Sequence, residues 1–76
     1  MREEMEKIVD EHINKLFDIA GEYFKLAEEQ DSEAKKSAYV GLAFATLSSA
    51  NAHDAQREQI INDIIKGMKG GESLGV

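Results

Sequence analysis

Two histidines, His12 and His53, are the side chains of this sequence best suited to chemistry at neutral pH. A helical di-metal centre would place a glutamate three residues before each metal-binding histidine. Val9 and Ala50 occupy those positions instead. The zinc-protease and EF-hand patterns are also missing, and the chain has no cysteine. The sequence therefore predicts no metal site and no cofactor.

A serine nucleophile is the second chemical possibility. Ser49 and His53 are four residues apart and could touch on one face of a helix. A working hydrolase also needs an oxyanion hole and a substrate cleft, and the sequence offers no sign of either. We expect no catalytic residues and no enzyme activity. His53 is better interpreted as lying at the edge of an interface, where its protonation near about pH 6 would loosen self-association.

Nucleic-acid and phosphate binding have weak signals in the last third of the chain. Gly67 to Gly71 is glycine-rich, but it lacks the spacing of a phosphate-binding loop. The region after residue 55 faintly resembles a DNA-recognition helix, which carries basic and amide side chains. The side chains responsible are Gln56, Arg57, Gln59, Asn62 and Lys66, whereas the acidic Glu58 and Asp63 oppose this interpretation. An exposed polar helix face is the simpler interpretation.

Charge and length define the class of protein. The 76 residues suit one small domain, and their net charge of −6 lies in residues 1–31, which hold ten acids and four bases. This excess disfavours phosphate backbones as partners and would suit a basic protein surface. No basic leader followed by an apolar core is present, and no segment has the about 20 strongly apolar residues of a membrane span. We expect a cytoplasmic protein that does not enter membranes.

A long amphipathic helix is predicted over about residues 2–29. Its apolar residues follow the alternating four-three spacing of a heptad seam, and they are Val9, Ile13, Leu16, Ala20, Tyr23 and Ala27. Further apolar residues widen the seam on both sides, as in a helix bundle. The opposite face is charged, and its acids Glu4, Glu11, Asp18 and Glu22 form a candidate partner-binding surface.

A turn at about 30–32 and a second helix over about 33–69 complete the domain. Asp31 and Ser32 are good N-cap residues, and Gly70 suits the left-handed position that ends a helix. We favour one continuous helix, although a break near 51–54 is the alternative. Residues 70–76 are predicted to be a flexible tail.

The second helix needs burial on two faces. Ser37 to His53 is a 17-residue run without a formal charge, and a helix that is apolar on every side must be covered on more than one face. One face carries small residues at four-three spacing, and another carries large ones. We expect one face to pack on the first helix and the other on a second chain. The predicted self-association residues are Ala38, Gly41, Ala45, Ser48, Ala52, Ile61, Ile64, Ile65 and Met68.

These patterns predict an all-α helical hairpin that self-associates into a homodimeric, antiparallel four-helix bundle. The alternative fold is a monomeric three-helix bundle with breaks near 31 and 52. We expect a small, non-catalytic regulatory or adaptor protein that binds itself and another protein through its helices. Two other hypotheses remain, namely an acidic inhibitor of a basic nucleic-acid-binding protein and a nucleic-acid binder that uses the polar end of the second helix.

Overall fold

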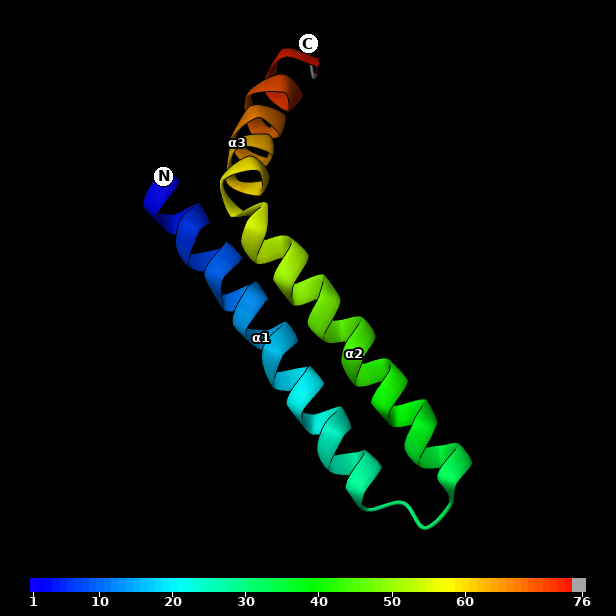
Figure 1. Cartoon of the computed structure of the whole chain (residues 1–76). Coiled ribbons are helices and arrows are strands. Elements are labelled where there is room, and N and C mark those ends of the chain that lie inside the picture. Colours follow the sequence, from blue (N-terminus) through cyan, green and yellow to red (C-terminus); the bar gives the residue numbers. More distant parts are fainter. Residues whose placement is uncertain (75–76) are drawn as a thin grey trace.

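The computed structural model is all-α. It describes residues 1–74, and it describes the exposure of side chains for residues 1–68. Three helices follow one another along the chain: α1 (Arg2–Glu28), α2 (Glu33–Ala55) and α3 (Arg57–Leu74). Helices α1 and α2 lie side by side as an antiparallel hairpin, and α3 bends across the open end of the hairpin (Figure 1). The predicted fold class is confirmed, and the presence of three helices fits the alternative fold.

The turn of the hairpin agrees with the sequence prediction. Ser32 is the N-cap of α2 with an extended backbone, and its side-chain oxygen accepts a hydrogen bond from the Lys35 N–H at 3.4 Å. An N-cap serine satisfies one of the free N–H groups of the first helical turn. At the end of α1, the Gln30 side-chain amide donates to the Leu26 carbonyl at 3.0 Å. The polar turn residues thus end one helix and begin the next.

Alanines lie at the centre of the seam between α1 and α2. Ala20 and Ala27 of α1 are buried, as are Ala43 and Ala50 of α2. A short side chain lets two helix backbones approach closely, because interaxial distance depends on the side chains at the contact. The predicted seam of α1 is confirmed, since Val9 and Ile13 are also buried. The face of α2 that packs on α1 is the one with the larger residues, including the half-buried Tyr39 and Leu47.

Aromatic pairs close the two edges of this narrow seam. Phe24 and Phe44 meet edge to face with ring centroids 5.4 Å apart. The rings of Tyr23 and Tyr39 lie 6.3 Å apart. Such pairs add about 0.5–1.5 kcal/mol beyond the burial of their area. Each joins one residue of α1 to one of α2, so the pairs help fix the antiparallel register.

The second helical segment is not continuous, which differs from the favoured prediction. It stays helical through 51–54 but ends at Ala55, and Gln56 has φ −100° and ψ 12°. The Gln56 N–H still bonds the Ala52 carbonyl at 3.0 Å, and the Ile60 N–H bonds the Gln56 carbonyl at 2.9 Å. Gln56 is therefore a sharp bend that keeps most of the helical hydrogen bonds.

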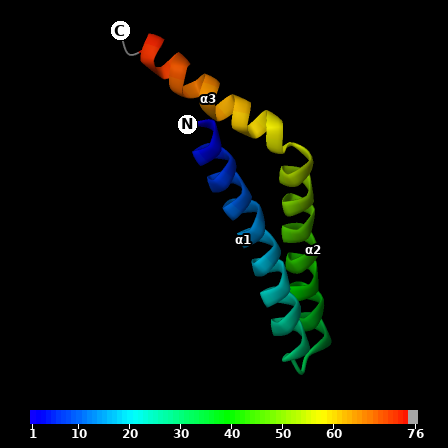
Figure 2. The same ribbon diagram turned by 90° about the vertical axis from the view of Figure 1, so that its left-hand side faces the viewer.

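Packing at the end of the hairpin gives a physical reason for the bend. A straight α2 would run past the N-terminus of α1 and leave its isoleucines without cover. The bend instead turns α3 over α1, as the rotated view makes plain (Figure 2). Ile61 becomes fully buried in a cluster with Val9 and Ile13, and the partly buried residues around this cluster are Met5, Ile60, Ile64 and Ile65.

Helix α3 also ends later than predicted. It extends to Leu74, beyond the helix end predicted near residue 69, and residues 75–76 lie outside the described residues. The flexibility predicted for residues 70–76 stays a prediction. No glycine in the described part of the chain has positive φ, so the left-handed cap predicted for Gly70 does not form. Glycine tolerates helical dihedrals at a cost of about 1 kcal/mol relative to alanine, and this cost does not prevent the helix from continuing.

The burial of Ile61 predicts a large loss of stability on truncation. Ile61→Ala should lower the free energy of unfolding by about 2–5 kcal/mol, because it removes buried carbons and leaves a cavity beside Val9 and Ile13. Urea unfolding followed by circular dichroism measures this. The exposed Lys66 offers a control, since Lys66→Ala should change stability by less than about 0.5 kcal/mol. Equal stability of the two variants would contradict the packing of α3.

Candidate protein-interaction surface

The outer face of α2 carries a stripe of small, exposed residues. We call it the small-residue stripe, and it consists of Ala38, Gly41, Ala45, Ser48 and Ala52. All five residues are exposed, and they recur at the four-three spacing that keeps side chains on one face of a helix. Because Ala43 and Ala50 face α1, α2 presents small residues on two opposite faces.

Two large apolar residues flank the small-residue stripe. Leu42 is 47% exposed and Phe44 is 56% exposed. At 100° per residue these side chains project on either side of the line through Gly41 and Ala45. The outer face of α2 thus carries a row of small residues with one apolar residue on each side.

Gly41 is not required by any contact within the chain. A Cβ atom at this position would meet no other atom within 4 Å. Glycine inside a helix costs about 1 kcal/mol relative to alanine, so the described structure gives no reason for glycine at residue 41. Close approach of another backbone would explain a glycine here, because glycine leaves the helix surface unobstructed.

Helix α1 exposes large apolar residues on both sides of the seam. Phe17 is exposed on the side of the Phe24–Phe44 pair, seven residues before Phe24. The opposite side carries three exposed residues, which are Ile8, Ile19 and Leu26. The Phe24 side also has an open hollow of about 270 Å³, lined by Phe24, Ala27, Glu28, Lys36 and Val40. The apolar flanks predicted from the sequence are therefore only partly covered by α2.

The predicted self-association residues of α3 do not form one surface. Ile61 is fully buried inside the chain, so it cannot also face a second copy. Ile64 and Ile65 are half-buried against the same cluster, and Met68 is exposed. Sequence reasoning assigned these residues to self-association because it did not foresee the bend at Gln56.

The acidic face of α1 is exposed along its length. Glu4, Glu11, Asp18 and Glu22 all lie away from α2. Lysines alternate with them on this face, and these exposed bases are Lys7, Lys15 and Lys25. Near the N-terminus an open hollow of about 420 Å³ is lined by Glu3, Glu4, Glu6, Lys7, Asp10 and Arg57. The face is mixed in charge, which is typical of a hydrated helix surface.

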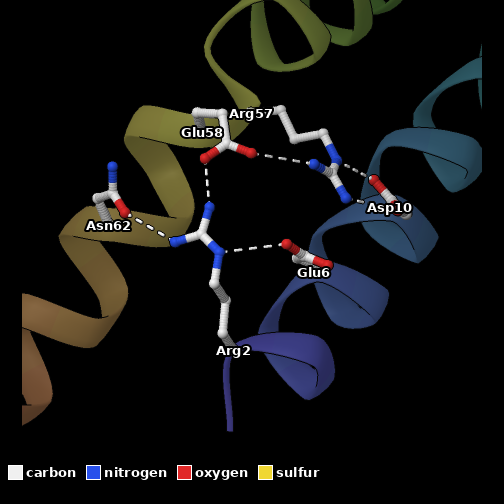
Figure 3. A network of polar contacts seen from close by, with 6 residues as sticks. All are labelled: Arg2, Glu6, Asp10, Arg57, Glu58 and Asn62. Atoms are coloured by element: carbon white, nitrogen blue, oxygen red, sulfur yellow. Dashed lines mark hydrogen bonds and ion pairs between the residues drawn. The ribbon is translucent and has the colours of Figure 1, made fainter.

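A polar network joins α3 to the first turns of α1 (Figure 3). Arg57 donates to Asp10 through Nε at 2.6 Å and through Nη2 at 3.1 Å, a two-point contact. Arg2 contacts Glu6 at 3.2 Å, donates to Asn62 Oδ1 at 3.0 Å and pairs with Glu58. Arg57 also pairs with Glu58 at 3.4 Å, which links the two arginines through one carboxylate. Sequence reasoning missed this network, since its contacts between α1 and α3 join residues 47 to 60 positions apart.

The electrostatics of the network centre on Asp10. Its pKa lies below the ordinary value because Arg57 donates hydrogen bonds to the carboxylate and adds a favourable charge, whereas desolvation opposes the shift. The pKa of Arg57 is raised for the same reason. Two-point contacts of this kind match the planar guanidinium to the carboxylate.

The two histidines meet across the seam. His12 Nε2 and His53 Nδ1 are 3.0 Å apart, with ring centroids at 5.0 Å and ring planes tilted by 30°. One ring donates and the other accepts, since a neutral imidazole carries one N–H. The sequence offered no sign of this pair, because contact between residues 12 and 53 depends on the register of the two helices. In the described part of the chain, no group of three or more His, Cys, Asp or Glu side chains gathers around a possible ion position.

Comparisons with known proteins identify no relative. The chain matches no protein family, no curated protein and no solved structure. Among the described residues, no helix combines the length and apolar character needed to cross a membrane.

The Asp10–Arg57 contact predicts a pH-dependent loss of stability. A lowered pKa in the folded state stabilises the fold above the ordinary aspartate pKa of about 4, and this stability is lost as pH falls through the lowered value. Asp10→Asn should therefore lower the melting temperature at about pH 7, and the difference from the parent chain should shrink below about pH 4. Melting temperatures of both chains, measured by thermal unfolding between about pH 7 and below about pH 4, test this prediction.

Asp18→Asn is the matched control for this prediction. It removes the same charge from the exposed acidic face, away from α2 and α3. Its melting temperature should follow the parent chain more closely than that of Asp10→Asn. Equal melting temperatures for Asp10→Asn and the parent chain at neutral pH would show that the contact contributes nothing.

Proposed function

We propose that this protein is a small non-catalytic regulatory or adaptor protein that acts through helix-mediated protein–protein interaction, and that its first partner is a second copy of itself. The observation that carries the proposal is the exposed small-residue stripe of α2 between Leu42 and Phe44. Exposed apolar surface of this kind is typical of an interaction site.

The dimensions of the chain support a need for a partner. Its radius of gyration is 17.1 Å and its extents are 57 × 23 × 16 Å. A compact domain of this length has a radius of gyration of about 11 Å. The accessible surface of 5608 Å² exceeds by about 1,000 Å² the value of about 4,600 Å² typical of a folded monomer of this mass. A standard interface buries about 800 Å² per partner, so one further copy would remove most of the excess.

The proposed dimer places the two α2 helices together in antiparallel orientation, with α1 of each copy outside. A two-fold axis makes the same patch face itself. Ala45 lies seven residues from Ala38 and seven from Ala52, at the centre of the stripe, and would meet Ala45 of the second copy. Leu42 and Phe44 would cover the edges of the contact. The result is a single layer of four antiparallel helices, flatter than the four-helix bundle expected from the sequence, because the small-residue stripe lies opposite the face of α2 that packs on α1.

The other two hypotheses have weaker support. The acidic face carries exposed lysines between its acids, which weakens it as a competitor for a basic surface. At the polar end of α2 and the start of α3, Arg57 contacts Asp10 and Glu58, Gln59 donates to Asp63, and Asn62 accepts from Arg2. Side chains engaged in this way are not free to contact phosphates.

A bulky residue at the centre of the small-residue stripe should weaken the dimer. Ala45→Leu adds volume where two backbones approach, and overpacking costs about 1–3 kcal/mol, or about 5- to 150-fold in the dissociation constant. Because Ala45 is exposed within one chain, the fold of that chain should remain intact. Light scattering coupled to size exclusion, over a range of concentrations, gives the mass.

Asn14→Leu is the matched control, since it adds an exposed leucine to the outer face of α1. It should leave the dissociation constant unchanged. A parent chain that stays monomeric at every concentration would overturn the proposal of self-association. A dimer that tolerates Ala45→Leu would move the interface to another face.

A single cysteine at residue 45 tests the position of the two-fold axis. The chain contains no cysteine, so Ala45→Cys introduces one thiol per copy. A disulfide requires Cα atoms about 4.4–6.8 Å apart, which two residues on the axis satisfy. Mild oxidation should convert Ala45→Cys almost completely into a covalent dimer, as judged by non-reducing electrophoresis. Asn14→Cys should remain mostly monomeric, and equal cross-linking of both variants would contradict the proposed axis.

A further inference from the structure

The geometry of the histidine pair points to a function that is independent of self-association. We propose that His12 and His53 form a two-imidazole site for a divalent transition-metal ion of the Cu²⁺, Ni²⁺ and Zn²⁺ class. The ion would bind His12 through Nε2 and His53 through Nδ1, and would join α1 to α2 within one chain. Water would occupy its remaining positions.

The separation of the two nitrogens fits a shared ion. Nitrogens bound at about 2.0–2.1 Å to one Zn²⁺ at a tetrahedral angle lie about 3.3–3.4 Å apart. At a right angle, as in tetragonal Cu²⁺ or Ni²⁺ sites, the separation is about 2.8–3.0 Å. The observed separation is 3.0 Å. Small rotations of the rings would therefore place an ion between the nitrogens without moving the helices.

The ring positions give a second geometric match. Two imidazoles on one ion, at angles between the square and tetrahedral values, have ring centres about 4.5–5.3 Å apart. The centroids of His12 and His53 are 5.0 Å apart. Binding also requires both facing nitrogens to offer a lone pair. The proton that now lies between them would move to the other nitrogen of the same ring, so the pair stays neutral and no further reactant is needed.

The site is held by packed helices rather than by loops. His12 lies between Val9 and Ile13, which are both buried, and His53 lies three residues after the buried Ala50. The rings themselves remain accessible, since His12 is exposed and His53 is half-buried. Imidazole nitrogens prefer transition metals, whereas carboxylates and carbonyls suit Ca²⁺ and Mg²⁺. The pair should therefore discriminate against these two hard ions.

Titration calorimetry with Cu²⁺, Ni²⁺ and Zn²⁺ tests the proposal on the full chain without a histidine tag, at about pH 7.5, where imidazoles are neutral. We expect one ion per chain at this site, with Cu²⁺ bound most tightly. His12→Gln and His53→Gln should each weaken binding at least about tenfold, because even indirect support of a ligand is worth about 10- to 100-fold. Glu29→Gln removes an exposed carboxylate and should leave binding unchanged.

Nitrogen NMR of the imidazole rings with Zn²⁺ distinguishes this site from casual binding at the surface. Coordination should shift Nε2 of His12 and Nδ1 of His53 at the same ion concentration, in dilute samples of unchanged mass. The proposal fails if none of the three ions binds, if either histidine variant binds as the parent chain does, or if the shifted atoms are the other ring nitrogens. It also fails if the ion links two chains through one histidine from each.

Discussion

Close approach of α1 and α2 over buried alanines is the constraint on which the rest of the structure depends. Ala20, Ala27, Ala43 and Ala50 are the small residues that set the distance between the two helices. Where these alanines meet, the aromatic side chains project from the edges of the seam, whereas Val9 and Ile13 are buried nearer the open end of the hairpin. This placement explains the cross-helix aromatic pairs, and it explains why Ile8, Phe17, Ile19 and Leu26 remain exposed on α1.

A seam built on alanine has an energetic consequence. Hydrophobic stabilisation follows the apolar area removed from water, at about 25 cal/mol per Å², and alanine has little area to bury. The larger contribution comes from the end of the hairpin, where Ile61 lies against Val9 and Ile13. The bend at Gln56 thus gives the described part of the chain a cluster around a large, fully buried side chain, Ile61. The arginine network lies across the same junction, so apolar and charged contacts hold α3 at the same place.

The sequence was sufficient for the first helix, the turn, the start of the second helix and one side of the core. The heptad spacing from Val9 to Ala27 correctly predicted the buried face of α1, and Ser32 correctly predicted the start of α2. It could not select the face of α2 that packs on α1, because small residues occur on both faces and either would allow close approach. It also could not place the bend, since Gln56 is neither glycine nor proline and only the tertiary packing of α3 favours bending there.

The arginine network and the histidine pair were the least predictable features, because both depend on the register of the helices. The Arg57–Asp10 contact and the His12–His53 pair each join residues more than 40 positions apart in sequence. The turn length and the alanine seam set which residues of α1 and α2 face each other, and a change of one helical turn would separate the histidines. An ion at the histidine pair would join α1 to α2 but make no contact with α3. Among the described side chains, the arginine network supplies the charged contacts between α1 and α3. Ion binding at the histidine pair would therefore strengthen the contact between α1 and α2 without fixing the bend at Gln56.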